Sequence, residues 1–371
     1  MQNHLVQKTC EIELRSGTIL LRFTAPSWAK GFKCEPGSCG LCCMVEPPEK
    51  TPRKRFALLD TSICQFYSYP ERICTKYTQR PWGCRTYPFI FGIEDKELKV
   101  STMLGCPATN VTTDVDLDDL KATFCDPAVK PSIEWIFSMF NDAKRSELWK
   151  DADNIWNTVS KNVEKYISRL RSFPFLLELR SLVLNAVDDC LDIPKSRREH
   201  PKVPPFLNVV RNMSKGYIAT GLSSCKVWMT KLHGTKMRFT SFDPKSRKTT
   251  TIKKRIPIEP PQLEIEKRSR ELLADYGSLM VRRPFLFLGA VSSRILPQVI
   301  PMSSSDHLVG AFLSLEVGAS VISARESTSE IDKKTMREIL SFSEACVHSQ
   351  FKAPDRALSF GSRLTSRARK S

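Results

Sequence analysis

Apolar and polar residues alternate near the start of the chain, along EIELRSGTILLRF at residues 11–23. The alternation turns at Ser16-Gly17, and a period of two on both sides of a glycine turn predicts a β-hairpin. A second alternating stretch, PFIFGIEDKELKVSTM at residues 88–103, turns around Glu94-Asp95 and predicts a second hairpin. Because the residues between them offer little aliphatic core, we expect a small, loop-rich α+β unit that requires a staple to stay folded.

Helical periodicity replaces the alternation from about Asp114. Apolar residues recur at helical spacing along two stretches, namely Ile133, Ile136, Phe137 and Phe140, and then Ile155, Trp156, Val159, Val163, Tyr166, Ile167 and Leu170. Pro174 then opens a third segment, PFLLELRSLVLNAVDDCL, which is apolar on most faces. We therefore predict three helices, and we expect the third to be buried together with its Cys190.

Strand and helix patterns both occur in the C-terminal half. The segment DIPKSRREHPKVPP at residues 192–205 carries four prolines and predicts a linker or a domain seam. CKVWMTKL, GTKMRFTSF and KTTTIKKRIPI predict three strands, with DPKSRK as the turn between the last two. Helices return from Gln262 in QLEIEKRSRELLADYGSLM and in STSEIDKKTMREILSFSEACVHS, where Ser327 and Glu330 have the spacing of a capping box.

The positive charge of the chain is strong and uneven. Of 371 residues, 57 are Lys or Arg and 40 are Asp or Glu, so the net charge is +17. Residues 193–260 hold 16 basic and 3 acidic side chains, whereas residues 1–130 are nearly balanced. Aromatic residues lie among these basic ones: Tyr217, Trp228, Phe239 and Phe242. This mixture predicts a partner for residues 193–260, either single-stranded nucleic acid or an acidic protein; the alternative is a solvated strand face whose aromatic residues turn into a core.

Thirteen cysteines are present, and eight of them lie between Cys34 and Cys106. The eight candidate metal ligands are Cys34, Cys39, Cys42, Cys43, Cys64, Cys74, Cys84 and Cys106. Because no histidine lies among them, any metal site here is sulfur-only, and eight thiolates suit two four-cysteine sites or one site with spare cysteines. A disulfide framework is the alternative, but the adjacent Cys42-Cys43 pair bridges poorly and the first residues, with Glu11 and Arg15 ahead of any apolar run, do not form a signal peptide.

The spacing leaves the metal open between zinc and an iron–sulfur cluster. Cys34, Cys39 and Cys42, followed much later by Cys74, have the spacing of plant-type [2Fe–2S] ferredoxins, but this pattern does not account for Cys43. A radical-SAM motif would need three residues between the first two cysteines, where this chain has four. The all-sulfur donor set favours an iron–sulfur cluster narrowly over zinc.

The same residues carry a family resemblance. CEPGSCGLCC, SICQFY, RICTKYTQRPWGCRTYPF and GCP resemble the YkgJ-type CxxCxxCC cysteine-cluster proteins, a family described as zinc- or iron-chelating, over about Phe32 to Pro107. The four-residue gap between Cys34 and Cys39 departs from the shorter spacing of many members. Bacterial flagellin lysine methylases look like relatives, but the chain lacks a Gly-rich loop for a methyl donor, so methylation is not implied.

Within this region we expect Cys42, Cys43, Cys74 and Cys84 to matter most for metal binding. Lys33 and Arg85 are candidates to neutralise the thiolates or to donate hydrogen bonds to sulfur, and the alternative for Arg85 is an ordinary surface or packing role. The five histidines lack partners at motif spacing, and no P-loop, dinucleotide fingerprint or nucleophile elbow occurs. Any enzymatic chemistry would therefore belong to the metal or cluster.

These observations predict an α+β fold in which a small metal-stapled domain precedes a mainly helical region with a basic β segment. The predicted units are 1–112 (cysteine-cluster domain), 113–192 (helices), 193–260 (basic strands), 261–350 (helices) and 351–371 (a basic, flexible tail). No apolar stretch approaches the roughly 18–20 residues of a spanning helix, so we expect a cytoplasmic protein without membrane contact. Two functions follow as hypotheses: a redox or cluster-dependent protein, or a structural-zinc protein whose basic segment holds its partner.

Overall fold

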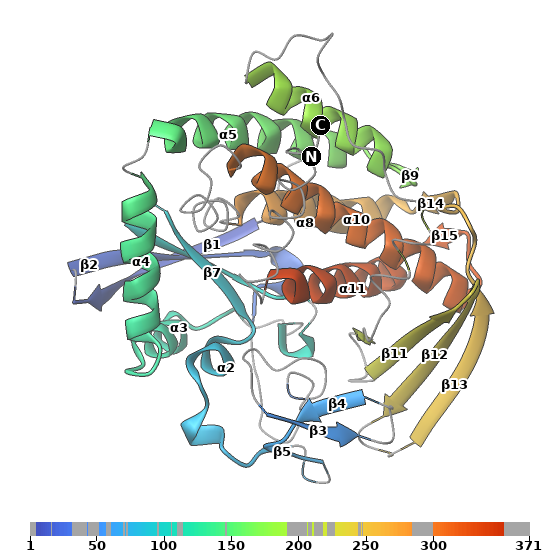
Figure 1. The fold of residues 1–371 in the computed structure, drawn as a ribbon, viewed down its shortest axis with the longest axis horizontal. Coiled ribbons are helices and arrows are strands. Elements are labelled where there is room, and N and C mark those ends of the chain that lie inside the picture. Colours follow the sequence, from blue (N-terminus) through green and yellow to red (C-terminus); the bar gives the residue numbers. More distant parts are fainter. Residues whose placement is uncertain are drawn as a thin grey trace, which may run out of the picture.

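The computed structural model gives the protein an α+β fold, as the sequence predicts (Figure 1). The structure describes residues 5–15, 17–31, 43, 52–56, 61–69, 71, 73–94, 96–104, 106–109, 114–144, 147–190, 206, 210, 218–220, 227–243, 246, 248–283 and 300–351. The predicted proline-rich linker and the predicted tail therefore lie outside the described residues.

The two predicted hairpins are confirmed, and they join into one four-stranded sheet. Its strands are β1 (Leu5–Leu14), β2 (Gly17–Pro26), β7 (Phe89–Glu94) and β8 (Glu97–Thr102), in the order β1-β2-β8-β7. Leu14 lies opposite Gly17, whose φ of 116° favours glycine, and Glu94 lies opposite Glu97. The central strands β2 and β8 run parallel.

Helices contact this sheet from several directions. They are α3 (Leu117–Cys125) against β1, α4 (Lys130–Lys144) against β7, and α8 (Lys267–Arg282) against β2. Asp116 begins α3 by accepting a 2.9 Å hydrogen bond from the N–H of Asp118, as an N-cap residue does. On the sheet, Ile12, Leu21 and Phe23 are fully buried.

The remaining helices form a bundle in which α10 (Ile300–Glu326) contacts each of the others. The others are α5 (Glu147–Ile167), α6 (Leu176–Cys190) and α11 (Lys333–Phe351). The predictions for α4, α5, α6, α8 and α11 are confirmed, except that Leu263–Ile265, predicted as the beginning of the α8 helix, form a strand. The periodicity does not predict α10, because α10 contacts α5, α6 and α11 and therefore buries apolar residues on several faces instead of forming one stripe.

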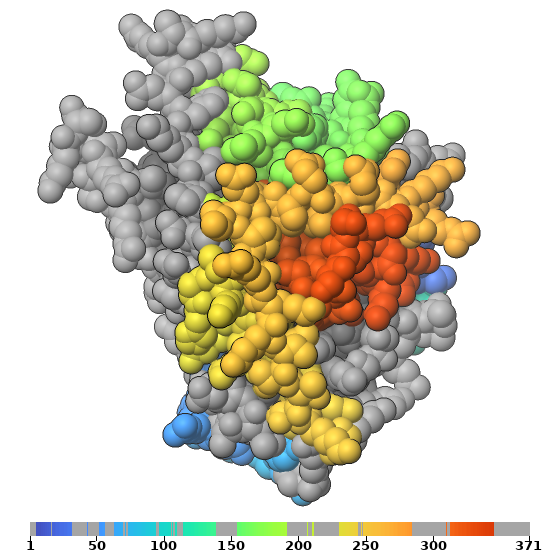
Figure 2. Space-filling view, turned by 90° about the vertical axis from the view of Figure 1, so that its right-hand side faces the viewer, coloured from blue at the N-terminus to red at the C-terminus, as the bar shows by residue number. Residues whose placement is uncertain are grey.

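The predicted basic strands form a second sheet, which is antiparallel throughout. It contains β10 (Ile218–Thr220), β11 (Val227–His233), β12 (Lys236–Asp243) and β13 (Lys248–Arg255), in that order. Figure 2 shows this sheet, in yellow and gold, at the surface beside the orange and red C-terminal helices. The sheet contacts α11 through β10 and α10 through β13.

Short elements complete the fold. β3 (Arg53–Phe56) pairs with β4 (Thr61–Cys64), β5 (Tyr67–Ser68) pairs with β6 (Ile73–Cys74), and β14 (Leu263–Ile265) lies between β9 (Ser172–Phe173) and β15 (Glu330–Ile331). The short helices are η1 (Ser27–Ala29), η3 (Tyr77–Gln79), α2 (Trp82–Thr86) and η4 (Pro107–Thr109).

Two local predictions are wrong. The Ser327–Glu330 capping box does not form, because Glu330 belongs to β15 and α11 begins later, where the side chain of Asp332 accepts a 2.7 Å hydrogen bond from the N–H of Thr335. Cys190 is exposed at the end of α6 instead of buried, although Leu179 and Val183 of that helix are fully buried.

One continuous core connects the regions. It runs from Ile12 of the first sheet through the helices to Met237 of the second sheet and Phe342 of α11. Among the residues that the structure describes, no helix combines the length and apolarity needed to cross a membrane.

Candidate metal centre

Five of the eight predicted metal ligands lie in the described part of the chain. Cys34, Cys39 and Cys42 lie outside the described residues, as does Lys33. Cys43 is half-buried, and Cys64, Cys74, Cys84 and Cys106 are distributed over the strands and turns that follow. None of the eight described cysteines is assigned to a disulfide.

Cys64 and Cys74 belong to two small hairpins that follow each other in the chain. Cys64 ends β4, where it faces Arg53 of β3, and it is only 4 % exposed. Cys74 lies in β6 opposite Tyr67, and Tyr67 follows Cys64 by three residues in the sequence. The N–H and hydroxyl of Thr75 both bond the carbonyl of Phe66, at 2.8 and 3.1 Å, which fixes this pairing next to the two cysteines.

Cys84 and Cys106 flank the β7–β8 hairpin. Cys84 lies in α2, just before β7, and Cys106 follows β8 in a turn. Phe89 at the start of β7 pairs with Thr102 at the end of β8, so both cysteines are at the same end of the hairpin. Cys106 is 6 % exposed, and its carbonyl accepts bonds from the N–H and the hydroxyl of Thr109 at 3.1 and 2.7 Å.

A cluster of charged residues connects the segment before the cysteine region, at Lys30, with the segment after it, at Asp114. The N–H of Val115 donates to the carbonyl of Lys30 at 3.1 Å, and Asp114 pairs with Lys30 at 2.7 Å and with Lys8 at 3.1 Å. Hydrogen bonds from Lys30 and Lys8 lower the pKa of Asp114. The two ends of the cysteine region are therefore joined to each other and to β1.

Arg85 occupies a position between α2 and the helices. Its guanidinium donates to the carboxylate of Asp126 at 2.6 Å, to the carbonyl of Arg80 at 2.8 Å and to the carbonyl of Thr78. This network orders the segment that carries Cys84. All three of these contacts are with oxygen, and they match the packing role that is the alternative for Arg85.

The described cysteines do not by themselves complete a metal site. Within the described ranges, no three Cys, His, Asp or Glu side chains lie close enough together to hold a metal ion. Tetrahedral zinc and cuboidal or rhombic clusters each require about four ligands. A metal centre that includes Cys64, Cys74, Cys84 or Cys106 would therefore also need thiolates from residues 34–43. The cysteines at residues 34–43 are sulfur donors like the described ones.

Cysteines outside this region have other surroundings. Cys10 of β1 and Cys125 of α3 are both half-buried and belong to the apolar core. Burial raises the pKa of the Cys10 thiol, Lys121 opposes this effect, and Cys125 adds to it. Both cysteines pack against the core as small apolar residues do, and at Cys10 burial disfavours the thiolate that a metal requires.

A pocket that the sequence does not predict lies between the first sheet and α8. Its volume is about 280 Å³, and its lining includes Arg22, Glu97, Arg282 and Arg283. Arg22 pairs with Glu97 at 2.6 Å, Arg282 with Glu164 at 3.3 Å, and Arg283 with Glu344 at 2.5 Å. Because each of these arginines already has a carboxylate partner, the pocket offers little uncompensated charge to an anionic ligand.

Comparison of the chain with protein-family models, with curated proteins and with solved structures gave no match.

Proposed function

We propose that this protein binds a thiolate-ligated metal centre, an iron–sulfur cluster or zinc, through the cysteine region between Cys34 and Cys106. The observation that supports the proposal is that four of these cysteines lie in or next to short hairpins. Cys64 and Cys74 belong to two consecutive small hairpins, and Cys84 and Cys106 precede and follow the β7–β8 hairpin. The four other candidate ligands, Cys34, Cys39, Cys42 and Cys43, come from a single short stretch of sequence.

The environment of these cysteines suits a soft metal centre. Cys64 and Cys106 are almost fully buried, so a metal bound to them would be shielded from water. Soft thiolate ligands favour zinc, copper(I) or iron–sulfur clusters over hard oxygen-seeking cations. The same residues carry the resemblance to the YkgJ-type family, with Arg80-Pro81, Cys84-Arg85 and Tyr87-Pro88 as its most specific part. Membership of that family is part of the proposal.

The metal would also stabilise the region that holds it. Between β2 and β7, the residues that the structure describes form two-stranded sheets and short helices. Structural zinc contributes about 10–16 kcal/mol to the folding of small peptide domains. A centre that is also reduced by dithionite would add electron transfer or cluster-dependent chemistry, with the helical bundle beside it, whereas a redox-inert centre would be structural.

The composition of the purified protein tests the proposal. The full chain is purified anaerobically, and its metal and acid-labile sulfide are measured together with its visible spectrum. Iron with sulfide and a brown colour identifies a cluster, and about stoichiometric zinc without colour identifies a zinc site. A well-folded protein that contains neither metal would overturn the proposal.

Substitution of single cysteines locates the centre. We expect Cys84→Ser to lose most of the bound metal and to make residues 32–87 sensitive to protease, because serine is a poorer ligand for a soft metal. Cys190→Ser is the matched control, since Cys190 is exposed at the end of α6 and should keep the full metal content. If Cys190→Ser loses the metal and Cys84→Ser retains it, the centre lies elsewhere in the chain.

A further inference from the structure

Six basic side chains form two rows across the outer face of the second sheet. In the first row Lys231 of β11 lies opposite Arg238 of β12, which lies opposite Lys253 of β13. The second row lies two residues away along each strand. In it His233 of β11 lies opposite Lys236 of β12, which lies opposite Arg255 of β13. We name Lys231, His233, Lys236, Arg238, Lys253 and Arg255 the basic face.

The basic face follows from the alternation of these strands. Met237 and Phe239, which alternate with Lys236 and Arg238 along β12, are fully buried in the core. Side chains at alternate positions of a strand point to opposite faces of the sheet, so the remaining positions face outward. Five of the six basic-face side chains are exposed, and Arg238, in the middle strand, is half-buried.

Like charges oppose one another across this face. Directly opposed side chains have Cβ atoms only about 4.5–5.5 Å apart, and like charges at that spacing destabilise a sheet. In the part of the chain that the structure describes, no ion pair joins a basic-face residue to a carboxylate, whereas Arg22, Arg85 and Arg283 each have one. An anionic partner would therefore remove a repulsion that the folded protein leaves in place.

The neighbouring positions favour phosphate as that anion. The next row of the same face holds Thr240 and Thr251, whose hydroxyl groups lie 3.3 Å apart. Lys, Arg and Thr side chains are the usual donors to phosphate oxygens in nucleic-acid complexes. A surface that combines two cationic rows with a hydroxyl row thus matches a sugar–phosphate backbone better than it matches the carboxylates of an acidic protein.

Two of the four aromatic residues predicted to take part in base stacking are buried, whereas Tyr217 and the side chain of Trp228 lie outside the described part of the chain. Phe239 and Phe242 are both fully buried, and the ring of Tyr69, from the cysteine region, lies 5.5 Å from that of Phe242. Binding of single-stranded nucleic acid relies on stacking of bases on aromatic rings. The burial of both phenylalanines therefore contradicts their predicted role in stacking and favours contacts with the backbone alone.

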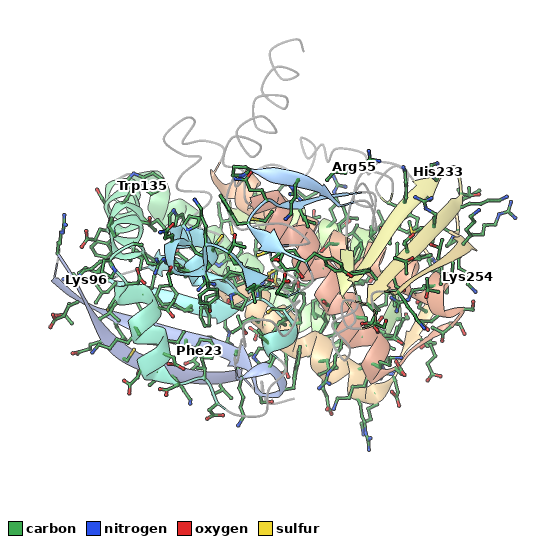
Figure 3. All side chains as sticks on the ribbon, turned by 90° about the horizontal axis from the view of Figure 1, so that it is seen from below. Phe23, Arg55, Lys96, Trp135, His233 and Lys254 are labelled. Carbon is green, nitrogen blue, oxygen red and sulfur yellow. The ribbon has the colours of Figure 1, made fainter. Side chains whose placement is uncertain are left out.

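We propose that the basic face binds the phosphate backbone of double-stranded nucleic acid, with little dependence on base sequence. The face adjoins the cysteine region through the Tyr69–Phe242 contact. Arg53, Lys54 and Arg55 of β3 are exposed in that region, and Figure 3 shows Arg55 on the same side of the molecule as His233. β3 therefore carries further exposed basic side chains on this side of the molecule. This proposal is independent of the identity of the metal.

Salt-dependent binding of a DNA duplex tests the proposal. The full chain is titrated against a fluorescent duplex of about 20 base pairs at several salt concentrations. Each phosphate contact adds about −0.9 to the slope of the logarithm of the binding constant against the logarithm of the salt concentration. We expect Arg238→Gln/Lys253→Gln to make that slope less steep by about 2 and to weaken binding to unrelated duplexes equally. The thermal midpoint of this variant should not fall, because the substitutions remove a like-charge pair.

Two controls separate this effect from a general loss of charge. Lys161→Gln/Lys165→Gln removes two exposed cations from α5, and Lys254→Gln removes a cation of β13 that points to the other face and bonds the hydroxyl of Ser327 at 2.8 Å. Both controls should leave the salt slope within about 1 of wild type. The proposal is overturned if the protein does not bind the duplex, if the controls weaken binding as much as the double variant, or if polyglutamate displaces the duplex at equal charge concentration.

Discussion

At the scale of single residues, Glu316 shows how a buried carboxylate can serve a helix to which it does not belong. Glu316 lies in α10, yet its Oε2 accepts hydrogen bonds from the N–H groups of Phe175 and Leu176, each at 2.9 Å. The first N–H groups of a helix have no partner within the helix, and these two are at the start of α6. Glu316 therefore caps α6 from the centre of the bundle, a role with no signal in the local sequence of α6.

This cap should make stability depend on pH. Burial raises the pKa of Glu316, although the two N–H donors oppose the effect. When a carboxyl has a raised pKa in the folded state, its stabilising contribution is complete below the unfolded-state pKa and is lost as the pH rises through the folded-state pKa. Glu316→Gln keeps an acceptor oxygen and does not ionise. We expect the unfolding free energy of wild type to fall relative to that of Glu316→Gln between about pH 4 and pH 7.

Urea unfolding of both proteins across this range measures the difference. Glu316→Ala provides the comparison, because it removes the acceptor and leaves two buried N–H groups unsatisfied, at a cost of about 1–3 kcal/mol for each. Unfolding free energies of wild type and Glu316→Gln that run parallel from acid to neutral pH would contradict the expectation.

At the scale of elements, the close approach of α10 and α11 depends on a glycine. A Cβ atom at Gly318 would lie 2.9 Å from Cδ1 of Phe342 and 3.4 Å from the carbonyl oxygen of Ile339. Alanine gains about 1 kcal/mol of helix propensity over glycine, but overpacking a core costs about 1–3 kcal/mol. Because the carbonyl of Ile339 belongs to the backbone of α11, we expect Gly318→Ala to destabilise the protein by about 1–2 kcal/mol.

A second substitution tests whether Phe342 is the cause of that loss. Phe342→Leu shortens the side chain that the new methyl group would meet, so the double variant should be more stable than the sum of the two single effects implies. The midpoint of denaturant unfolding provides the measurement. A midpoint for Gly318→Ala at or above that of wild type would show that the helices move apart at no cost.

Local patterns predict most of the elements, but not their partners. Alternation predicts both hairpins of the first sheet because one face of each strand is buried, as at Leu21 and Leu98. It does not predict that β2 and β8 lie side by side, since that pairing joins residues more than 70 positions apart. The Ser327–Glu330 prediction fails for a related reason: the parallel pairing of β15 with β14 holds Glu330 in a strand.

At the scale of the whole molecule, the candidate metal centre is predictable in part. Cysteine spacing indicates which residues to consider, because thiolates on one loop and on nearby turns can share a metal. Spacing does not show that Cys64 lies opposite Arg53 or that Cys74 lies opposite Tyr67, since these positions depend on the registers of two separate hairpins. Likewise, the charge of residues 193–260 predicts a basic surface. Only the strand register shows which basic residues belong to the outward basic face and that Lys254 points to the other face.

A buried ion pair of the core joins the first sheet to the C-terminal helices. Arg283, which follows α8, donates to both oxygens of Glu344 in α11, at 2.5 and 3.0 Å, and the two side chains are almost completely buried. The same guanidinium donates to the carbonyl of Thr102 at 3.1 Å and to the hydroxyl of Ser101 at 3.3 Å. Because these residues end β8, four positions before Cys106, the pair connects the bundle to the strand that leads into the candidate metal centre.

Removal of either partner should therefore be far more damaging than removal of both. Glu344→Gln leaves the guanidinium of Arg283 buried without a counter-charge, and breaking a buried pair in this way costs about 3–5 kcal/mol. The double variant Arg283→Met/Glu344→Leu replaces the pair with apolar side chains of similar size, so it should recover most of that loss. Denaturant unfolding of wild type, Arg283→Met, Glu344→Leu and the double variant gives the coupling energy between the two side chains. Additive losses in the double variant would show that Arg283 acts through its bonds to Ser101 and Thr102, with little contribution from Glu344.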